Sequence, residues 1–292
     1  MNVIFLSATT YGDPSKNNGD CIMVDTGSEL IVFDCGCVEH ARRVLEYMYR
    51  HNYRQAKVVL SHNDADHFNG IPYLVDYGAV SAVYTLLLLK YKDELLKRIG
   101  DRRITRESLS RRIAEIYDNI YSLGGAVELR DIFTDTFVAP DVTIPGPDME
   151  YALDAVAKRI DSRESDTIDK ETIVNAVSTQ LSVSFGYQKK LLLTGDSSFV
   201  AIEENVKNHN AIQLPHHGKL EQAESIFQVK GNETIYYVSD NTGSSNGGSY
   251  DLRRKYSRGH IIHNTLDGDQ SCVEAVFGEA KPTGSYFRWF LV

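Results

Sequence analysis

The chain has 292 residues, 42% of them hydrophobic, and its formal net charge is −9. This length suits one large α/β or sandwich domain with a sizeable core, and the acidic balance argues against a protein that coats nucleic acid. The first residues hold one short apolar run without a basic segment before it, and no apolar run is long enough to cross a bilayer. We therefore expect a globular protein that is not anchored in a membrane.

The first part of the chain, residues 1–85, alternates short β-rich runs with turns that contain Gly, Asn and Asp. The predicted strands are "NVIFL", "CIMVDTG", "ELIVFDCG" and "AKVVLSH", and an amphipathic helix, "VEHARRVLEYMYRHNY", joins the third strand to the fourth. This order predicts a strand meander that leads into a βαβ step.

Residues 86 to about 125 change to helical spacing with dense charge. Between Lys90 and Glu115 there are nine Lys or Arg and five Asp or Glu residues. We expect this segment to be a helical insert on the surface of the protein.

The rest of the chain returns to strand patterns. Strands are predicted around "VELRDIF", "TFVAPDVTIPGP", "VNAVSTQLSVSFGYQKKLLLTGD" and "AIQLPHHG", with the polar segment 150–172 as an interruption, and the last quarter mixes strands and turns. No internal repeat has a fixed period, and the loop "NTGSSNGGSYD" separates elements of one domain. We therefore expect residues 1–292 to form a single domain.

The four cysteines fall in no paired framework. Cys35 and Cys37 flank Gly36 and could form a metal or redox site, but small buried residues are the simpler interpretation for them and for Cys21 and Cys272. A reduced intracellular protein follows from this reading, and we expect it in the cytoplasm.

The stretch "KVVLSHNDADHFNGIPYL", residues 57–74, places four metal-capable side chains directly after an apolar run. If "KVVL" is a strand, His62 and Asp64 point the same way, and Asp66 and His67 follow as the chain turns. An Asp-rich turn that happens to contain two histidines is the alternative. The spacing favours a metal site, although it does not identify an enzyme.

This stretch resembles the H-x-H-x-D-H signature of the metallo-β-lactamase superfamily. Asp64 replaces its second histidine, which is similar to the hydrolase domain of the ComEC bacterial competence proteins. "NNGDCIMVDTGSELIVFDCG" resembles the opening strands of the family, with Asp34 as its first aspartate, and "KKLLLTGD" places Asp196 at the position of the aspartate that bridges two metals. "IQLPHHG" and "NAVSTQLSVSFGYQKK", with Asn175 and Ser178, are similar to two further family motifs.

The resemblance implies an αββα sandwich of two mixed sheets, with helices outside and metals at one edge. It also implies two divalent ions that activate a water molecule as the nucleophile, with Asp66 and Asp196 as catalytic carboxylates. The implied ligands are His62 and Asp64 for one ion and Asp66, His67 and His216 for the other, with Asp196 between the two ions; His217 is the alternative to His216. Residues expected behind the ligands or at the substrate are Asp34, Asn175, Ser178, His217 and His263.

Two departures from the family pattern bear on the metal and the substrate. Most members have a further histidine before the bridging aspartate, whereas residues 68–195 contain none. A carboxylate-rich site favours manganese or magnesium over zinc, although zinc stays open. ComEC-like domains also tend to carry His-Pro after the loop where this chain has "GGSYD"; His260 and His263 follow later, as substrate contacts or, as we prefer, structural residues.

The resemblance to ComEC-type domains suggests cleavage of phosphodiesters in DNA or RNA. Basic residues of the helical insert and of "LRRKYSR", residues 252–258, could contact phosphates, although charged helices are usually just solvated. The alternative substrates are a small ester, a lactone, or a linear or cyclic phosphoester in a pocket under the insert. A binding module without turnover is the third hypothesis, and the sequence leaves the native metal and the oligomeric state open.

Overall fold

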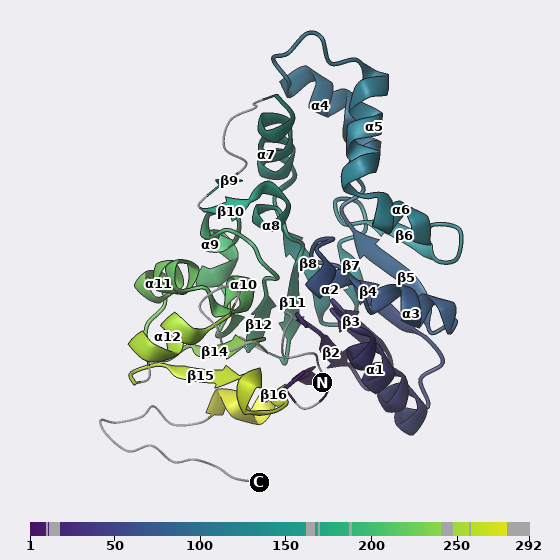
Figure 1. Ribbon diagram of the computed structural model, residues 1–292. Coiled ribbons are helices and arrows are strands. Elements are labelled where there is room, and N and C mark those ends of the chain that lie inside the picture. The colour runs from purple at the N-terminus through teal and green to yellow at the C-terminus, as the bar shows by residue number, and fades with distance from the viewer. Residues whose placement is uncertain are drawn as a thin grey trace.

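The computed structural model describes residues 1–9, 11, 18–161, 167–168, 170–186, 189–240, 248–256 and 258–278. Within these ranges the strands form two seven-stranded mixed sheets and one two-stranded ribbon, β9 (Thr167–Ile168) with β10 (Glu171–Thr172). Figure 1 shows the two large sheets side by side, with helices on their outer sides.

The first sheet has the order β16-β1-β2-β3-β4-β5-β6. Neighbours from β16 to β3 are antiparallel, and neighbours from β3 to β6 are parallel. The strands are β16 (Gln270–Val273), β1 (Asn2–Phe5), β2 (Ile22–Asp25), β3 (Leu30–Phe33), β4 (Ala56–Val59), β5 (Val80–Thr85) and β6 (Glu128–Asp131).

The second sheet has the order β15-β14-β13-β12-β11-β8-β7. It repeats the plan of the first, because the neighbours from β15 to β12 are parallel and the others antiparallel. The strands are β15 (Ile261–Asn264), β14 (Ile235–Val238), β13 (Ala211–Gln213), β12 (Lys190–Leu193), β11 (Gln180–Ser184), β8 (Val142–Gly146) and β7 (Phe137–Ala139).

The two sheets pack face to face through one large apolar core. Phe5 on β1 stacks on Tyr237 on β14, with ring centroids 4.5 Å apart. A second apolar cluster lies on the outer side of the second sheet, where Ile202, Ala223 and Leu252 of the covering helices meet residues of its parallel strands. This arrangement confirms the predicted fold, a sandwich of two mixed sheets between helices.

The helices cover the outer faces and fill the crossovers. Figure 1 shows α1 and α3 beside the first sheet and α9, α11 and α12 beside the second. The helices are α1 (Val38–His51), α2 (Ala65–Phe68), α3 (Ile71–Asp76), α4 (Lys92–Arg98), α5 (Arg106–Ile116), α6 (Asp118–Leu123), α7 (Met149–Asp161), α8 (Ile173–Ala176), α9 (Phe199–Lys207), α10 (Pro215–Gly218), α11 (Leu220–Val229) and α12 (Tyr250–Lys255), with 3₁₀ turns η1 (Leu88–Tyr91), η2 (Thr265–Asp267) and η3 (Glu274–Gly278). In the described ranges, no helix has the length and apolar character needed to span a bilayer.

The helices expected near residues 86–125 are α4, α5 and α6, which lie between β5 and β6. Thr105 and Ser108 form a reciprocal capping box at the start of α5, which satisfies backbone donors that a helix leaves open. Arg98 of α4 binds Glu150 and Asp154 of α7, at 2.6 and 2.5 Å. The segment is therefore attached to α7, which lies between β8 and β11 of the second sheet.

Two elements differ from the sequence-based expectation. The expected interruption at residues 150–172 begins with a regular helix, α7, whose apolar side chains Ala152, Leu153 and Val156 are buried. The run "VSAVYT" is a strand, β5, that is absent from the strands predicted for residues 1–85. A strand inside a parallel sheet is covered on both faces, so its sequence is nearly continuously apolar rather than alternating.

Candidate metal centre

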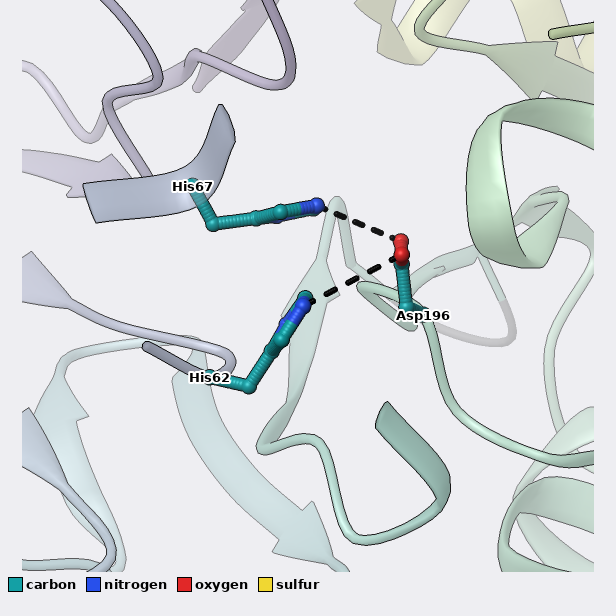
Figure 2. A group of neighbouring side chains, drawn as sticks. All are labelled: His62, His67 and Asp196. Carbon is teal, nitrogen blue, oxygen red and sulfur yellow. Dashed lines mark ion pairs between the residues drawn. The ribbon is translucent and has the colours of Figure 1, made fainter. Parts of the chain in front are cut away.

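The candidate site lies where strands of both sheets end. Asp34 follows β3, His62 follows β4, Asp196 follows β12 and His216 follows β13. These strands belong to the parallel parts of their sheets, whose carboxyl ends face the same edge, the usual place for a binding site in parallel α/β structures. Figure 2 shows His62 and His67 pointing at Asp196 from the opposite sheet.

His62, His67 and Asp196 form the first group of candidate ligands. Nε2 of His67 lies 3.3 Å from Oδ1 of Asp196, and Nε2 of His62 lies 3.9 Å from Oδ2. One ligand atom from each residue lies within 4.8 Å of the others, and all three residues are buried. Both Nε2 atoms and Oδ1 make no hydrogen bond within the described part of the chain. Because buried polar atoms that make no hydrogen bond are costly, this donor set fits the binding of cations.

Asp66, His67 and His217 form a second group with the same mutual spacing. Nε2 of His217 lies 3.1 Å from Oδ2 of Asp66. The sequence prediction placed His216 of "PHHG" with Asp66 and His67 and kept His217 as the alternative; the structure differs from that placement. The geometry brings His217 there, and it turns His216 toward Asp196 instead, with 3.8 Å between Nε2 and Oδ2.

The backbone of this turn explains why two adjacent histidines diverge. His216 and His217 both have left-handed backbone angles, with φ of 50° and 55°. Nδ1 of His217 lies 3.1 Å from Oδ1 of Asp20 and 2.9 Å from the carbonyl oxygen of Ser239. Nδ1 of His216 lies 2.6 Å from Oε2 of Glu171. Each ring is therefore held from behind by a different carboxylate.

His67 and His62 are also held through Nδ1. Oδ2 of Asp34 lies 2.8 Å from Nδ1 of His67 and accepts a hydrogen bond from the Ser61 hydroxyl. Nδ1 of His62 lies 2.9 Å from the Ser61 hydroxyl and 3.3 Å from that of Ser178. Contacts of this kind fix the ring orientation and direct Nε2 toward a metal.

The charges of the site shift its pKa values in opposite directions. Burial alone would raise the pKa of Asp196, but the nearby histidines, His67 foremost, hold it well below its usual value. Burial would lower the pKa of His67 and His217, but Asp196 and the carboxylates beside each ring raise it well above 6.5. The buried carboxylates therefore keep their negative charge and favour positive charge beside them, as the carboxylates of a metal centre do.

The remaining predicted residues fall into two sets. Asp64 is half-exposed with Oδ2 3.5 Å from Nε2 of His62, and Asn175 donates to Oδ2 of Asp196 at 3.3 Å, so both belong to the site. His263 lies on β15, where its ring stacks on Tyr237 with ring centroids 5.1 Å apart. The ring of His260 likewise stacks on Phe227.

The sequence interpretation missed Asp20, Ser61 and Glu171. Asp20 stands in "NNGDC", a stretch already singled out, and its neighbour Gly19 offers a signal: a Cβ there would lie 1.4 Å from the carbonyl oxygen of Asp66. Only glycine permits the approach, which lets the backbone N–H of Asp20 donate to that oxygen at 3.0 Å. Glu171 lies in the polar segment 150–172 and gives no comparable signal.

A hydrogen-bonded pair of asparagines joins the ligand loop to the helical segment. Asn63, between His62 and Asp64, donates to the carbonyl oxygen of Ile116 at 2.7 Å, and Asn119 donates to the carbonyl oxygen of Asn63 at 3.0 Å. The end of α5 and the start of α6 therefore border the site.

Comparison with known proteins identifies the family of the chain. Residues 15–238 match the profile of the "Metallo-beta-lactamase superfamily", and the chain belongs to this superfamily. No curated protein sequence matches the chain.

Several solved structures are similar over nearly the whole chain. The metallo-beta-lactamase fold protein YhfI from Bacillus subtilis is 12% identical, with 93% of this chain and 99% of that one covered and a TM-score of 0.49. Zn²⁺-bound PqqB from Methylobacterium extorquens has the same identity and coverage, with a TM-score of 0.48. Isothiocyanate hydrolase from Delia radicum gut bacteria is 10% identical, with 94% and 99% covered and a TM-score of 0.47.

Proposed function

We propose that the chain is a metal-dependent hydrolase that cleaves phosphodiesters with two divalent ions. The observation that carries the proposal is the convergence of buried Nε2 atoms of His62 and His67 on Asp196, with no hydrogen bond to satisfy them in the described part of the chain. His62 and Asp64 would hold the first ion, Asp66, His67 and His217 the second, and Asp196 both.

When bound, a pair of ions in such a centre activates water and stabilises the negative charge that develops on the attacked group. The protein's own part is to hold the ligands in place. Asn175 orients the carboxylate of Asp196 through its amide. Asp34 and Asp20 engage Nδ1 of His67 and His217, so that each Nε2 faces the centre and, in the neutral ring, offers its lone pair to an ion.

Asp64 supports the choice of a phosphodiester. The H-x-D-x-D-H pattern of "HNDADH" resembles the ComEC-type hydrolase domain, and this likeness is our reason for placing phosphodiesters first. A carboxylate in place of an imidazole also suits manganese or magnesium, the hard ions that are common in phosphate chemistry.

The charge of the helical segment favours a second candidate, a hydrolase of small esters, lactones or phosphoesters. Arg103 pairs with Asp101 at 2.8 Å, and Arg106 pairs with Asp93 at 2.9 Å. Because their charges are already paired with aspartates, these arginines attract a polyanion less strongly than the sequence alone suggests. A small substrate would not need a basic surface.

The test is a turnover assay of the purified protein loaded with Mn²⁺ or Zn²⁺. The substrates are DNA and RNA oligomers, a chromogenic phosphodiester, a lactone and a carboxyl ester, with chelated protein and Asp196→Asn as controls. Metal-dependent cleavage of the phosphodiesters supports the proposal. Cleavage of the lactone or the carboxyl ester alone transfers it to the second candidate, and metal binding without turnover of any substrate leaves the non-catalytic binding module.

A further inference from the structure

His216 is the histidine of the site that belongs to neither group of close ligand atoms. Its surroundings nevertheless follow the same pattern as those of the other three. In His62, His67 and His217, Nδ1 meets a hydrogen-bonding partner behind the ring and Nε2 faces a carboxylate of the centre. His216 does the same, with Glu171 behind it and Asp196 in front.

Glu171 is built into this position. Its side chain is 1% exposed, and its two oxygens meet three groups: Nδ1 of His216, the ammonium of Lys219 at 2.8 Å and the amide of Gln222 at 3.2 Å. A carboxylate beside an ammonium group accepts hydrogen bonds and donates none. Nδ1 of His216 therefore carries the proton in this contact, and in the neutral ring Nε2 keeps the lone pair that a metal needs.

The two histidines that flank Asp196 face one oxygen atom. Nε2 of His216 lies 3.8 Å from Oδ2, and Nε2 of His62 lies 3.9 Å from that same Oδ2. Oδ1 instead faces His67. His216 therefore faces the same oxygen of Asp196 as His62 does, while the rings of His62 and His67 themselves lie close together, with centroids 4.1 Å apart.

We propose that His216 is a ligand of the first metal ion and that Glu171 is its positioning residue. His216 would supply the imidazole that residues 68–195 lack, and the first ion would be held by His62, Asp64, Asp196 and His216. This inference rests on the proposed metal centre and concerns one ion of it. Because His216 lies outside the groups within 4.8 Å, ion binding has to draw its ring inward.

The backbone of the turn offers a matched pair of test variants. His216 and His217 both have positive φ, a conformation that glycine adopts without strain, so His216→Gly and His217→Gly remove each ring at little cost to the backbone. Metal-free protein is titrated with Mn²⁺ and with Zn²⁺, and bound ions are counted by mass spectrometry of the metals after gel filtration. We expect the parent to hold two ions and each variant to hold one.

Double variants show which ion each histidine serves. His62→Ala should also leave one ion, and His62→Ala with His216→Gly should still leave one, because both ligands act on the same ion. His216→Gly with His217→Gly should leave none. If the His216→Gly protein holds as many ions as the parent, with unchanged affinities, the inference is overturned and His216 contacts substrate or solvent instead.

Glu171→Gln tests the positioning residue without deleting the ring. We expect the affinity for one of the two ions to fall about 10- to 100-fold, the usual effect of removing such a partner. Glu221→Gln is the matched control, because Glu221 pairs with the exposed Lys170 at 3.8 Å on the same side of the molecule. Equal affinities in Glu171→Gln and the control overturn the role of Glu171. Thermal unfolding of each variant establishes whether it is folded. If His216→Gly does not fold, the result of Glu171→Gln alone decides the inference. Since ions are counted without any substrate, a failure to cleave phosphodiesters leaves this result unaffected.

Discussion

Oδ2 of Asp34 lies 2.8 Å from Nδ1 of His67, and both side chains are completely buried. The other oxygen of Asp34 accepts a hydrogen bond from the backbone N–H of Ser61 at 2.7 Å. One carboxylate therefore ties the end of β3 to the start of the ligand loop and sets the ring of His67. Burial raises the pKa of Asp34, and the charge of His67 opposes that rise, so His67 helps to keep Asp34 ionised.

Asp34→Asn should weaken metal binding without touching a ligand. The amide presents an N–H group on one side, so it cannot accept all the hydrogen bonds that converge on the carboxylate. We expect the metal affinity to fall about 10- to 100-fold and the protein to unfold at a lower temperature. The measurements are a metal titration and a thermal melt. Asp269→Asn is the control, since Asp269 pairs with Arg43; equal metal affinities in the two variants would contradict the role of Asp34.

Asp196→Asn should reduce the affinity for both ions at once. Asp196 lies between the two sets of histidines, and a neutral amide cannot balance two cations as a carboxylate does. Metal analysis after gel filtration gives the result. His217→Gly is the comparison because it should affect one ion alone. Full metal occupancy in Asp196→Asn would refute the shared position.

Asp64→His should move the metal preference toward zinc. Asp64 is half-exposed and its Oδ2 lies 3.5 Å from Nε2 of His62, so a histidine at this position has room to face the same ion. Manganese should support turnover of the parent at least as well as zinc, and the softer ligand should reverse this order. Activity is measured after reconstitution with each metal. Better turnover of the parent with zinc, together with loss of metal binding in Asp64→His, would show that the carboxylate does not set the preference.

The candidate ligands that can be grouped from the sequence alone are those that are contiguous in the chain. His62, Asp64, Asp66 and His67 lie within residues 62–67, which run from the end of β4 into α2. The choice between adjacent histidines depends instead on left-handed backbone angles, which side-chain pattern does not report. Glu171 reaches the site only because a two-stranded ribbon brings it there, a tertiary contact without a local signal.

The stability of the protein should fall as the pH falls from about 6.5 to 4. His40 is fully buried on α1, and burial lowers its pKa from 6.5 to about 4. Between these values the unfolded chain takes up a proton that folded His40 does not, so acid favours unfolding. The shift corresponds to roughly 3 kcal/mol at pH 4.

His40→Leu should flatten this dependence. Urea denaturation of metal-free protein between pH 4 and 7.5 gives the free energy of unfolding at each pH. The buried His209, whose pKa is also lowered to about 4, keeps a residual slope in the variant. His51→Asn, at the exposed end of the same helix, is the control. A slope in His40→Leu that equals that of the parent would exclude His40 as a source of the acid sensitivity.

The substrate class can be tested through Arg102, Arg103 and Arg106. If these arginines guide nucleic acid, they act through counterion release, so each phosphate that they neutralise adds to the salt dependence of binding. Replacing all three with Ala should then raise the apparent KM for a DNA or RNA oligomer several-fold and flatten its salt slope. A small chromogenic phosphodiester should be cleaved as before, because the metal centre is untouched.

The ion pairs of this segment limit how strongly the arginines can bind nucleic acid. Arg103 and Arg106 already face Asp101 and Asp93, and a polyanion has to compete with these carboxylates for the two guanidinium groups. Asp93→Asn with Asp101→Asn should therefore change the oligomer KM in the opposite direction, since it releases both arginines. The two sets of variants are compared across a salt titration. Unchanged oligomer kinetics in both would remove this surface from nucleic-acid binding and favour the small-molecule hydrolase, whereas opposite shifts in KM would support the nuclease.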